Sequence, residues 1–416
     1  MAAKWTIRHT AERIKARLDQ IVEDRHAQRP VRATASGMKP LPCVAIDVSH
    51  TVGEQISGVG RYAQNVAEGL ARFGPDDLEF LLLPGFAGFV HPKYGDGYHV
   101  DSPGGRNVNV YRGPLPAFVD ARTAVPGVSV VHGTSHRMPA ADGLPVLFTV
   151  HDLSFLTHPQ LHTRENVDLC RTNLEKARRA NATFLAVSAS TKSDLVRLLG
   201  VDPAFVRVVP NSYDDRRFRL GLADEVEDIR ITHHLPDAYL LFVGSLEPRK
   251  NLATLLTAVA EHDVGMPLVI SGAKGWRNEE IGKQIQAAGD RVKALGYVDE
   301  EDLPALYAGA RALVYPSLYE GFGLPLLEAM ACGTPVVSTR VSAIPEVVGD
   351  AGILLDDPRD ASALAAALSR LAGDDVERAR LSAKGLERAR LFSMERVTRD
   401  LVAIYRDLLA ETAIAR

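Results

Sequence analysis

The sequence predicts an α/β protein made of two doubly wound domains that face each other across a cleft. Two series of short apolar strands, one from residue 43 and one from near residue 239, alternate with helical patterns. The strands are nearly continuous runs of Val, Leu and Ile, which is typical of parallel sheets covered on both faces. A polar stretch at 211–237 separates the two series and is the best candidate for the domain boundary.

The composition is that of a globular protein with more than one domain. The chain has 416 residues, of which 46% are hydrophobic and 24% are charged. Its net charge of −4 gives no general attraction to nucleic acid or to membranes. No apolar run approaches the ~18 residues of a membrane span. Cys43, Cys170 and Cys332 lie far apart without metal-ligand spacing, which favours a reducing, cytoplasmic compartment.

Residues 1–40 form a separate N-terminal extension. Ile14, Leu18 and Ile21 recur at helical spacing among many Lys and Arg residues. A basic amphipathic helix can lie on anionic lipid, so peripheral contact with the inner face of the membrane is one hypothesis. The alternative is a solvated extension or a helix packed on the body of the protein.

The first series predicts a domain over residues 41–212. Strands are expected at 43–48, 78–83, 128–132, 146–150 and 184–188, and helices at 60–72, 164–180 and 190–199. Gly200 is expected to end the last of these helices.

The second series predicts a domain over residues 236–393. Strands are expected at 239–244, 267–272, 312–317, 335–339 and 352–355, and helices at about 251–260, 301–309 and 325–331. Ligands of such sheets bind beyond the carboxyl ends of the strands, where helix N-termini and glycine turns expose backbone N–H groups.

Two glutamates follow the strand at 312–317 in the stretch EGFGLPLLE. Glu320 is expected in the loop and Glu328 in the first turns of a helix that starts near Leu324 or Pro325, since proline suits the first helical position. Gly321 and Gly323 would let the backbone approach a ligand, and the helix N-terminus favours an anion.

Two cations follow the first strand of the same series. In FVGSLEPRKNL, the strand ends at Gly244, and Arg249 and Lys250 stand just before a helix. Paired cations in this position can hold a diphosphate and neutralise the charge on a leaving group.

In the N-terminal half, SGVGRYA places Gly58, Gly60 and Ala63 in the spacing G-x-G-x-x-A, which matches the dinucleotide-binding fingerprint. That fingerprint makes a tight turn directly off a strand, whereas here about nine residues intervene. The pattern is therefore interpreted as a glycine loop for phosphate or sugar.

Histidines mark two further places. His151, followed by Asp152, stands directly at the end of the strand at 146–150. His132 and His136 in HGTSH lack a third ligand, which makes a zinc site improbable. No Asp-x-Asp pair lies at a strand end, so the sequence does not imply a divalent metal.

Taken together, these residues resemble the family-4 retaining glycosyltransferases of the GT-B fold, in which two Rossmann-like domains face a nucleotide-sugar cleft. The resemblance covers about residues 41–415. It rests on Glu320 and Glu328 within EGFGLPLLE, on the following AMACGTPVV, and on VVPNS and LYAGARALVYPSLYEGFG. Ser212 departs from the glycine that the family commonly has.

The resemblance implies a role for each residue. Glu320 would contact donor-sugar hydroxyls and Glu328 the nucleotide ribose. Arg249 and Lys250 would bind the diphosphate, and His151 would lie beside the reacting sugar. The full expected donor site comprises Gly58, Gly60, Gly244, Arg249, Lys250, Tyr297, Val298, Glu320, Gly321, Phe322, Gly323, Leu324 and Glu328. A last helix at 394–413 would cross back to the N-terminal domain.

The resemblance also implies the reaction: transfer of a hexose with retention, without a metal and without a protein nucleophile. The leaving phosphate would accept the acceptor's proton while Arg249 and Lys250 stabilise its charge. SGAKGW and HDLSFLTHP resemble mannosyltransferases of bacterial polysaccharide and O-antigen assembly, which favours GDP-mannose over UDP-glucose and a glycan or lipid-linked acceptor.

Two alternatives stay open at this point. An NAD-dependent oxidoreductase would use Gly58, Gly60 and Ala63 but would leave Glu320, Glu328 and the two cations unexplained. A non-catalytic nucleotide-sugar-binding protein would keep the motifs without turnover.

Overall fold

The computed structural model describes residues 41–51, 56–83, 108–110, 127–139, 141, 143–273, 275–276 and 279–414. The amphipathic helix expected within residues 1–40 lies outside these ranges. None of the described helices combines the length and the apolar character that a bilayer crossing requires.

The N-terminal sheet has seven strands in the order β3-β2-β1-β4-β5-β6-β7, and all of its pairings are parallel. The strands are β1 Cys43–Asp47, β2 Glu79–Leu83, β3 Val108–Val110, β4 Val128–Gly133, β5 Val146–Val150, β6 Thr183–Ala186 and β7 Val206–Val208. The chain order reverses between β1 and β4, and doubly wound sheets bind ligands at the carboxyl ends beside such a reversal.

The C-terminal sheet repeats this arrangement with six strands in the order β10-β9-β8-β11-β12-β13, again all parallel. The strands are β8 Leu240–Val243, β9 Leu268–Ser271, β10 Val292–Gly296, β11 Ala312–Tyr315, β12 Val336–Thr339 and β13 Gly352–Leu355. Its reversal lies between β8 and β11. The predicted fold class, two doubly wound domains, is confirmed.

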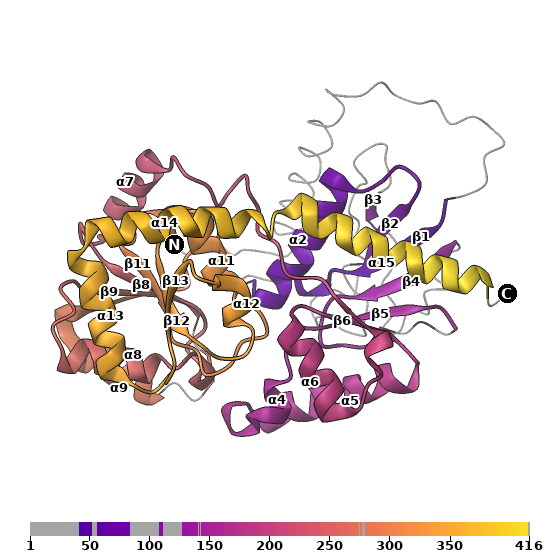
Figure 1. Ribbon diagram of the computed structural model, residues 1–416, viewed down its shortest axis with the longest axis horizontal. Coiled ribbons are helices and arrows are strands. Elements are labelled where there is room, and N and C mark those ends of the chain that lie inside the picture. Colours follow the sequence, from indigo (N-terminus) through magenta and orange to yellow (C-terminus); the bar gives the residue numbers. More distant parts are fainter. Residues whose placement is uncertain are drawn as a thin grey trace, which may run out of the picture.

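Helices cover both sheets (Figure 1). In the N-terminal half they are α2 Gly58–Phe73, α4 Ser154–Thr157, α5 Arg164–Arg179 and α6 Ala189–Leu199. The later helices are α7 Ala223–Thr232, α8 Leu252–Glu261, α9 Glu279–Ala288, α10 Leu303–Ala308, α11 Leu324–Ala331, α12 Ile344–Val348, α13 Ala361–Gly373, α14 Asp375–Arg390 and α15 Met394–Ile414. Short 3-10 turns are η1 Ser49–Thr51, η3 Pro159–Leu161, η4 Pro203–Phe205, η5 Pro248–Lys250 and η6 Gly289–Arg291.

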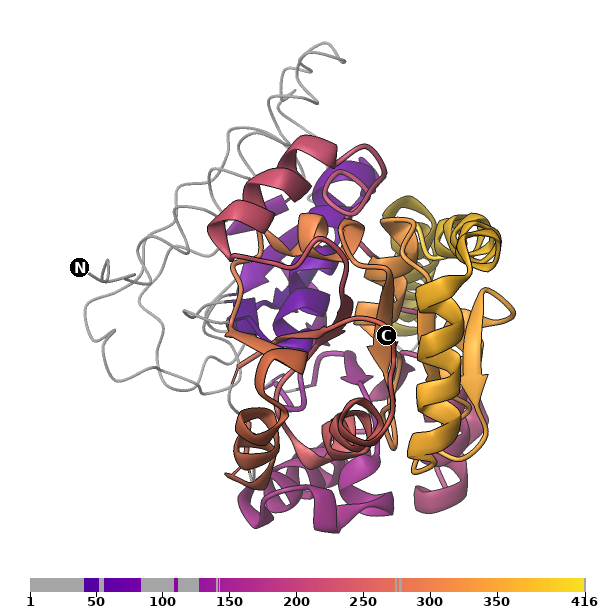
Figure 2. The same ribbon diagram turned by 90° about the vertical axis from the view of Figure 1, so that its left-hand side faces the viewer.

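The central strands are buried on both faces, which explains their continuous apolar runs. Every residue of β1 and of β8 is buried. Figure 2 looks at the C-terminal domain end-on and shows helices standing on either side of its sheet. Burial from both sides removes the alternation of polar and apolar residues that a half-exposed strand would need.

The last helix joins the two halves of the molecule. In Figure 1, α14 lies over the C-terminal domain and α15 continues across the N-terminal domain. Tyr405 of α15 is fully buried, and its hydroxyl lies 2.7 Å from His132 Nδ1 of β4. The crossing that the resemblance implies is therefore present.

The expected boundary at 211–237 is wrong in one respect, because this polar stretch contains α7. His233, which ends the helix, has its Nε2 3.1 Å from Asp302 Oδ2 of the C-terminal domain, so the second domain begins before residue 236. Ile229 is the one buried residue of this helix, and one buried residue is too weak a pattern to distinguish the helix from a linker.

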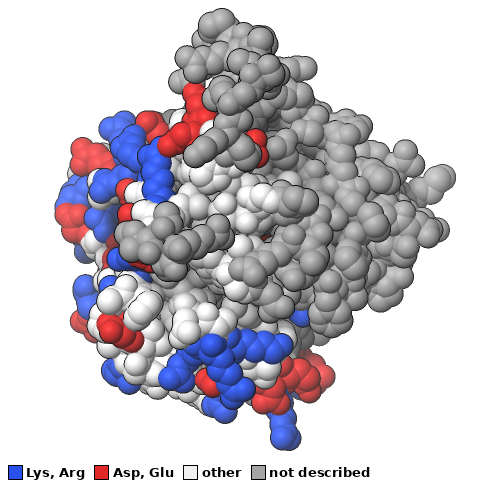
Figure 3. All heavy atoms as spheres, turned by 90° about the vertical axis from the view of Figure 1, so that its right-hand side faces the viewer, with Lys and Arg blue, Asp and Glu red and all other residues white. Residues whose placement is uncertain are grey.

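The described outer surface of the N-terminal domain carries charges of both signs (Figure 3). In the first half of α5, the exposed Arg164 and Arg171 flank the exposed Glu165 and Asp168. This part of the helix therefore presents no field of a single sign.

Candidate active site

The residues predicted to bind a ligand gather where the two sheets reverse. Arg249 and Lys250 lie in η5, after β8, and Glu320 lies in the loop between β11 and α11. Since β8 and β11 are neighbours in the sheet, their carboxyl ends bring these side chains together. Gly244 directly follows β8 and donates its N–H to the Ser271 carbonyl at 2.9 Å.

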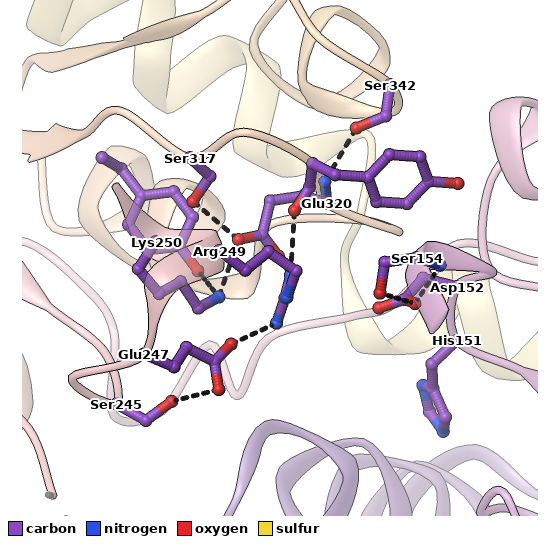
Figure 4. A network of polar contacts seen from close by, with 12 residues as sticks. His151, Asp152, Ser154, Ser245, Glu247, Arg249, Lys250, Ser317, Glu320 and Ser342 are labelled. Carbon is purple, nitrogen blue, oxygen red and sulfur yellow. Dashed lines mark hydrogen bonds and ion pairs between the residues drawn. The ribbon is translucent and has the colours of Figure 1, made fainter. Parts of the chain in front are cut away.

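Glu320 is the centre of a buried polar network (Figure 4). Its Oε1 accepts hydrogen bonds from Lys250 Nζ and from Ser317 Oγ, each at 2.7 Å. Its Oε2 accepts from Arg249 Nη1 at 2.9 Å. Its backbone N–H donates to Ser342 Oγ at 2.8 Å. The carboxylate is therefore fixed from several sides.

Charge explains why this carboxylate tolerates burial. Burial by itself would raise the pKa of Glu320, but the charges of Arg249 and Lys250 outweigh it and lower the pKa to about 2. Burial and the neighbouring Arg249 lower the pKa of Lys250. Glu320 is consequently ionised at neutral pH and acts as a hydrogen-bond acceptor, not as a proton donor.

A second carboxylate, Glu247, belongs to the network although the sequence did not single it out. It is 3% exposed, and its Oε1 accepts from Arg249 Nη2 at 2.8 Å. Its Oε2 accepts from Ser245 Oγ at 3.2 Å. Two cations thus stand beside two carboxylates, which balances their charge and holds the Arg249 guanidinium in one orientation.

Tyr315, the last residue of β11, is the other contact that the sequence did not indicate. The Lys250 ammonium donates to the Tyr315 hydroxyl and lies 4.8 Å from the centre of its ring. The end of β11 therefore holds the lysine through the tyrosine hydroxyl.

Glu328 lies in a separate group. It is in the second turn of α11, and its Oε2 accepts from the Tyr307 hydroxyl at 2.9 Å. Arg61 of α2 approaches Oε1, with Nε at 3.7 Å. Burial raises the pKa of Glu328, although Arg61 and Tyr307 act against the shift. The two motif glutamates are thus held by different partners, as binding two parts of one ligand would require.

The other expected donor-site residues of the C-terminal domain either shape the backbone or pack in the core. Gly323 precedes α11 with a φ of 108°, and Leu324 begins that helix. Phe322 packs edge-on against Phe392, with ring centres 5.5 Å apart, so its ring belongs to the core. Tyr297 follows β10, and its hydroxyl accepts from the Ile56 N–H at 3.4 Å. Val298 is buried.

His151 stands at the carboxyl end of β5 in the N-terminal domain. Its Nε2 lies 2.8 Å from the Thr134 carbonyl, which can only accept, so Nε2 carries the proton and the neutral ring keeps an acceptor at Nδ1. Burial lowers the pKa of His151, opposed by the Thr134 hydrogen bond and by Asp152. In Figure 4 no hydrogen bond or ion pair joins His151 to the Glu320 network.

At Gly321 the backbone of the C-terminal domain closely approaches that of the N-terminal domain. A Cβ atom added to Gly321 would lie 1.7 Å from the His151 carbonyl oxygen. The glycine therefore allows the Glu320 loop to touch the end of β5. It brings the proposed donor residues and His151 to the same place.

The expected glycine loop at 58–60 is wrong, because these residues begin α2. Gly58 opens the helix, and Gly60 and Ala63 are buried within it. A Cβ atom on Gly60 would lie 2.3 Å from the His50 carbonyl oxygen, so this glycine is required for helix packing. The tight turn of a dinucleotide site is absent here, since η1 lies between β1 and α2.

The described residues contain no group of three or more His, Cys, Asp or Glu side chains arranged to hold a metal ion. His132 is fully buried, with its ring nitrogens 2.7 Å from the Tyr405 hydroxyl and 2.8 Å from Thr149 Oγ1. Its two nitrogens are thus occupied by hydroxyl partners.

Each half of the chain matches a known protein family. Residues 56–217 match Glycosyltransferase Family 4, and residues 225–388 match Glycosyl transferases group 1. O-antigen chain mannosyltransferase B of Escherichia coli is 35% identical over 284 residues, covering 67% of this chain and 74% of that one. MMP alpha-(1->4)-mannosyltransferase of Mycolicibacterium hassiacum is 31% identical over 360 residues, covering 81% of this chain and 80% of that one.

Solved structures show the same fold. Sucrose-phosphate synthase from Thermosynechococcus elongatus superposes with a TM-score of 0.68 at 26% identity, covering 89% of this chain and 100% of that one. Anabaena Alr3699/HepE in complex with UDP-glucose has a TM-score of 0.65 at 18% identity, covering 90% of this chain and 100% of that one.

Proposed function

Since the chain belongs to the family-4 glycosyltransferases of the GT-B fold, we propose that it transfers mannose from GDP-mannose to a glycan or lipid-linked acceptor, with retention at the anomeric carbon. The observation that carries this proposal is the network of Arg249, Lys250 and Glu320 at the reversal of the C-terminal sheet. It offers two cations for a diphosphate and one ionised carboxylate for sugar hydroxyls.

The chemistry follows from these charges. The bond from the anomeric carbon to the diphosphate breaks, a bond to the acceptor oxygen forms on the same face, and the acceptor's proton passes to the leaving phosphate. Arg249 and Lys250 stabilise the charge that develops on that phosphate. Glu320 holds the sugar and does not attack it, because its oxygens are already engaged by Arg249, Lys250 and Ser317.

His151 completes the proposed site from the N-terminal domain. Its unprotonated Nδ1 can accept a hydrogen bond from a hydroxyl of the transferred sugar, which fixes the ring beside the acceptor. The closeness of Gly321 to His151 requires the domains to be together when this contact forms. Closure would also exclude water, which otherwise hydrolyses the donor.

Mannose is proposed because the relatives named above are mannosyltransferases of an O-antigen chain and of MMP. UDP-glucose is the second candidate, because HepE was solved with that nucleotide sugar. An oxidoreductase is not proposed, since Gly58 and Gly60 form no dinucleotide turn.

Calorimetric titration with GDP-mannose, UDP-glucose and NAD tests the donor. We expect one nucleotide sugar to bind and Lys250→Ala to weaken it by about 100-fold, the effect of removing a charged hydrogen-bond partner. Lys283→Ala is the matched control, because Lys283 forms an exposed ion pair with Glu280 on α9. Tight NAD binding that Lys250→Ala leaves unchanged would overturn the proposal.

The product tests the reaction itself. NMR of the glycoside formed from GDP-mannose should show the anomeric configuration of the donor. Turnover should persist in excess EDTA, because Arg249 and Lys250 supply the positive charge that a divalent ion would otherwise provide. An inverted product would contradict the proposed mechanism, and loss of turnover in EDTA would contradict its independence of metal.

A further inference from the structure

Arg61 is a buried cation that reaches from one domain into the other. It lies in the first turn of α2, the N-terminal-domain helix that lies beside the C-terminal domain in Figure 1, and its side chain is 10% exposed. Its Nη2 is 3.1 Å from Glu300 Oε1, and its Nε is 3.7 Å from Glu328 Oε1. Both carboxylates belong to the C-terminal domain.

One nitrogen of this guanidinium makes no hydrogen bond to the described residues. Arg61 Nη1 is buried and has no hydrogen-bond partner among the described residues. A buried donor without a partner costs about 1–3 kcal/mol, and native proteins leave few such groups unsatisfied. A partner that is absent from this structure would remove that cost.

The neighbouring carboxylate, Glu328, has an oxygen that can accept a further hydrogen bond. Glu328 Oε2 is engaged by the Tyr307 hydroxyl at 2.9 Å, whereas Oε1 has the longer 3.7 Å contact with Arg61. An unused donor and a loosely engaged acceptor therefore lie next to each other. A hydroxyl group fits this pair, because it can donate its proton to Glu328 and accept one from Arg61.

We propose that Arg61 is a donor-binding residue that clamps the nucleotide ribose together with Glu328. A ribose hydroxyl donates to Glu328 Oε1 and accepts from Arg61 Nη1. The proposal rests on the proposed function, which places the ribose at Glu328. It adds a contact from the N-terminal domain, so that nucleotide binding draws on both domains and favours their closed arrangement.

The test compares the nucleoside diphosphate that binds wild type with its 2′-deoxy and 3′-deoxy analogues by calorimetry. Removing the clamped hydroxyl should weaken wild-type binding about 10- to 100-fold, since it removes hydrogen bonds to two charged groups. Arg61→Met and Arg61→Lys should weaken binding of the ribose nucleotide at least about tenfold. The ratio of affinities between the ribose and deoxy nucleotides should shrink at least about fivefold. Arg61→Lys keeps the charge beside Glu300 in case Arg61→Met fails to fold.

Arg72→Met is the matched control. Arg72 lies on the same helix, has the same 10% exposure and pairs with Asp214 and Asp215. We expect it to lower the melting temperature and to leave the ribose-to-deoxy ratio unchanged.

The outcomes separate two failures. If wild type binds no nucleoside diphosphate, the proposed function is wrong and this inference falls with it. If wild type discriminates ribose from deoxyribose and the Arg61 variants do so equally well, Arg61 is a structural ion-pair partner only. If those variants weaken all three ligands equally, Arg61 acts at the phosphates, which also overturns the clamp.

Discussion

At Gly321 a single missing side chain allows the two domains to touch. A Cβ atom there would lie 1.7 Å from the His151 carbonyl oxygen, far inside van der Waals contact, so Gly321→Ala must push the Glu320 loop away from β5. A misplacement of about 1 Å can cost about 100-fold in rate. We therefore expect Gly321→Ala to lower kcat/KM for transfer by about 100-fold or more, measured with donor and acceptor together.

The stability of the Gly321→Ala protein provides the control. Its φ is not among the positive values in this structure, so alanine introduces no backbone strain, and urea unfolding should show only the loss of about 1–3 kcal/mol that an overpacked buried contact costs. Gly282→Ala on α9, where an added Cβ meets no atom within 4 Å, should leave transfer intact. Full activity of Gly321→Ala would show that catalysis does not need this contact.

The sequence located the site residues whose chemistry is unusual for their position. Arg249, Lys250 and Glu320 stood out because charged residues at the ends of buried strands need a reason. Arg61 was missed because its importance depends on Glu328, which is remote in sequence. A local pattern contains no information about such a contact between domains.

Among the elements, α6 depends on a residue from the other domain. Glu346 of α12 accepts hydrogen bonds from the backbone N–H groups of Ala189 and Ser190, at 2.8 and 2.6 Å. Ser188 accepts from Thr191 N at 3.0 Å. The first turn of α6 is thus capped partly by its own chain and partly by the C-terminal domain, where a carboxylate is favoured by the helix dipole.

Glu346→Ala should therefore loosen closure. Losing this cap should destabilise the closed arrangement of the domains by about 1 kcal/mol or somewhat more. We expect kcat/KM for transfer to fall about tenfold, because about 1.4 kcal/mol corresponds to a factor of ten. Small-angle scattering should show a larger radius of gyration.

Asp360→Ala distinguishes a domain contact from an ordinary cap. Asp360 accepts from Ala363 N at 2.8 Å at the start of α13, wholly within the C-terminal domain. Its removal should cost similar unfolding free energy while transfer and radius of gyration stay unchanged. Identical behaviour of both variants would rule out a role of Glu346 in closure.

The strands that the sequence did not predict share one property. β3, β7 and β10 all lie at sheet edges, and in β7 (VRV) and β10 (VKALG) the first residue alone is buried. Each of these edge strands has one neighbour, β7 and β10 are only partly covered, and each of the three lacks the continuous apolar run that identifies a central strand. The remaining edge strand, β13 (GILL), keeps such a run and was predicted. The central strands were predictable because burial on both faces imposes that run.

For the whole molecule, histidines with lowered pKa values should make the N-terminal domain less stable in acid than the C-terminal domain. Burial lowers the pKa of His50 and of His136 to about 4 and that of His132 to about 3. All three lie in the N-terminal domain, beside β1 and β4. In the unfolded chain they bind protons below pH ~6.5, so the folded state loses stability as the pH falls from about 6.5 towards 4.

Asp47 acts in the opposite direction. Burial raises its pKa to about 6, although hydrogen bonds from Ser49 and Ser135 lower it. Since its folded pKa is above its unfolded pKa, acidification through pH 6 relieves an unfavourable buried charge. From pH 7 to pH 5 each histidine costs about 2 kcal/mol and Asp47 returns about 1 kcal/mol. For the three histidines and Asp47 together, the net loss of about 5 kcal/mol approaches the whole stability of many domains.

We therefore expect the N-terminal domain to unfold first on acidification. Hydrogen exchange, corrected for its intrinsic pH dependence, should speed up in β4 and β5 at pH 5 while β11 and β12 stay protected. His136→Gln removes one of the three titrating rings and should reduce the pH slope of the unfolding free energy by up to about 1.4 kcal/mol per pH unit. Equal loss of protection in both sheets, or an unchanged slope in His136→Gln, would contradict this assignment.

Because His151 lies on the same sheet and burial lowers its pKa too, transfer activity should disappear together with the protection of β5.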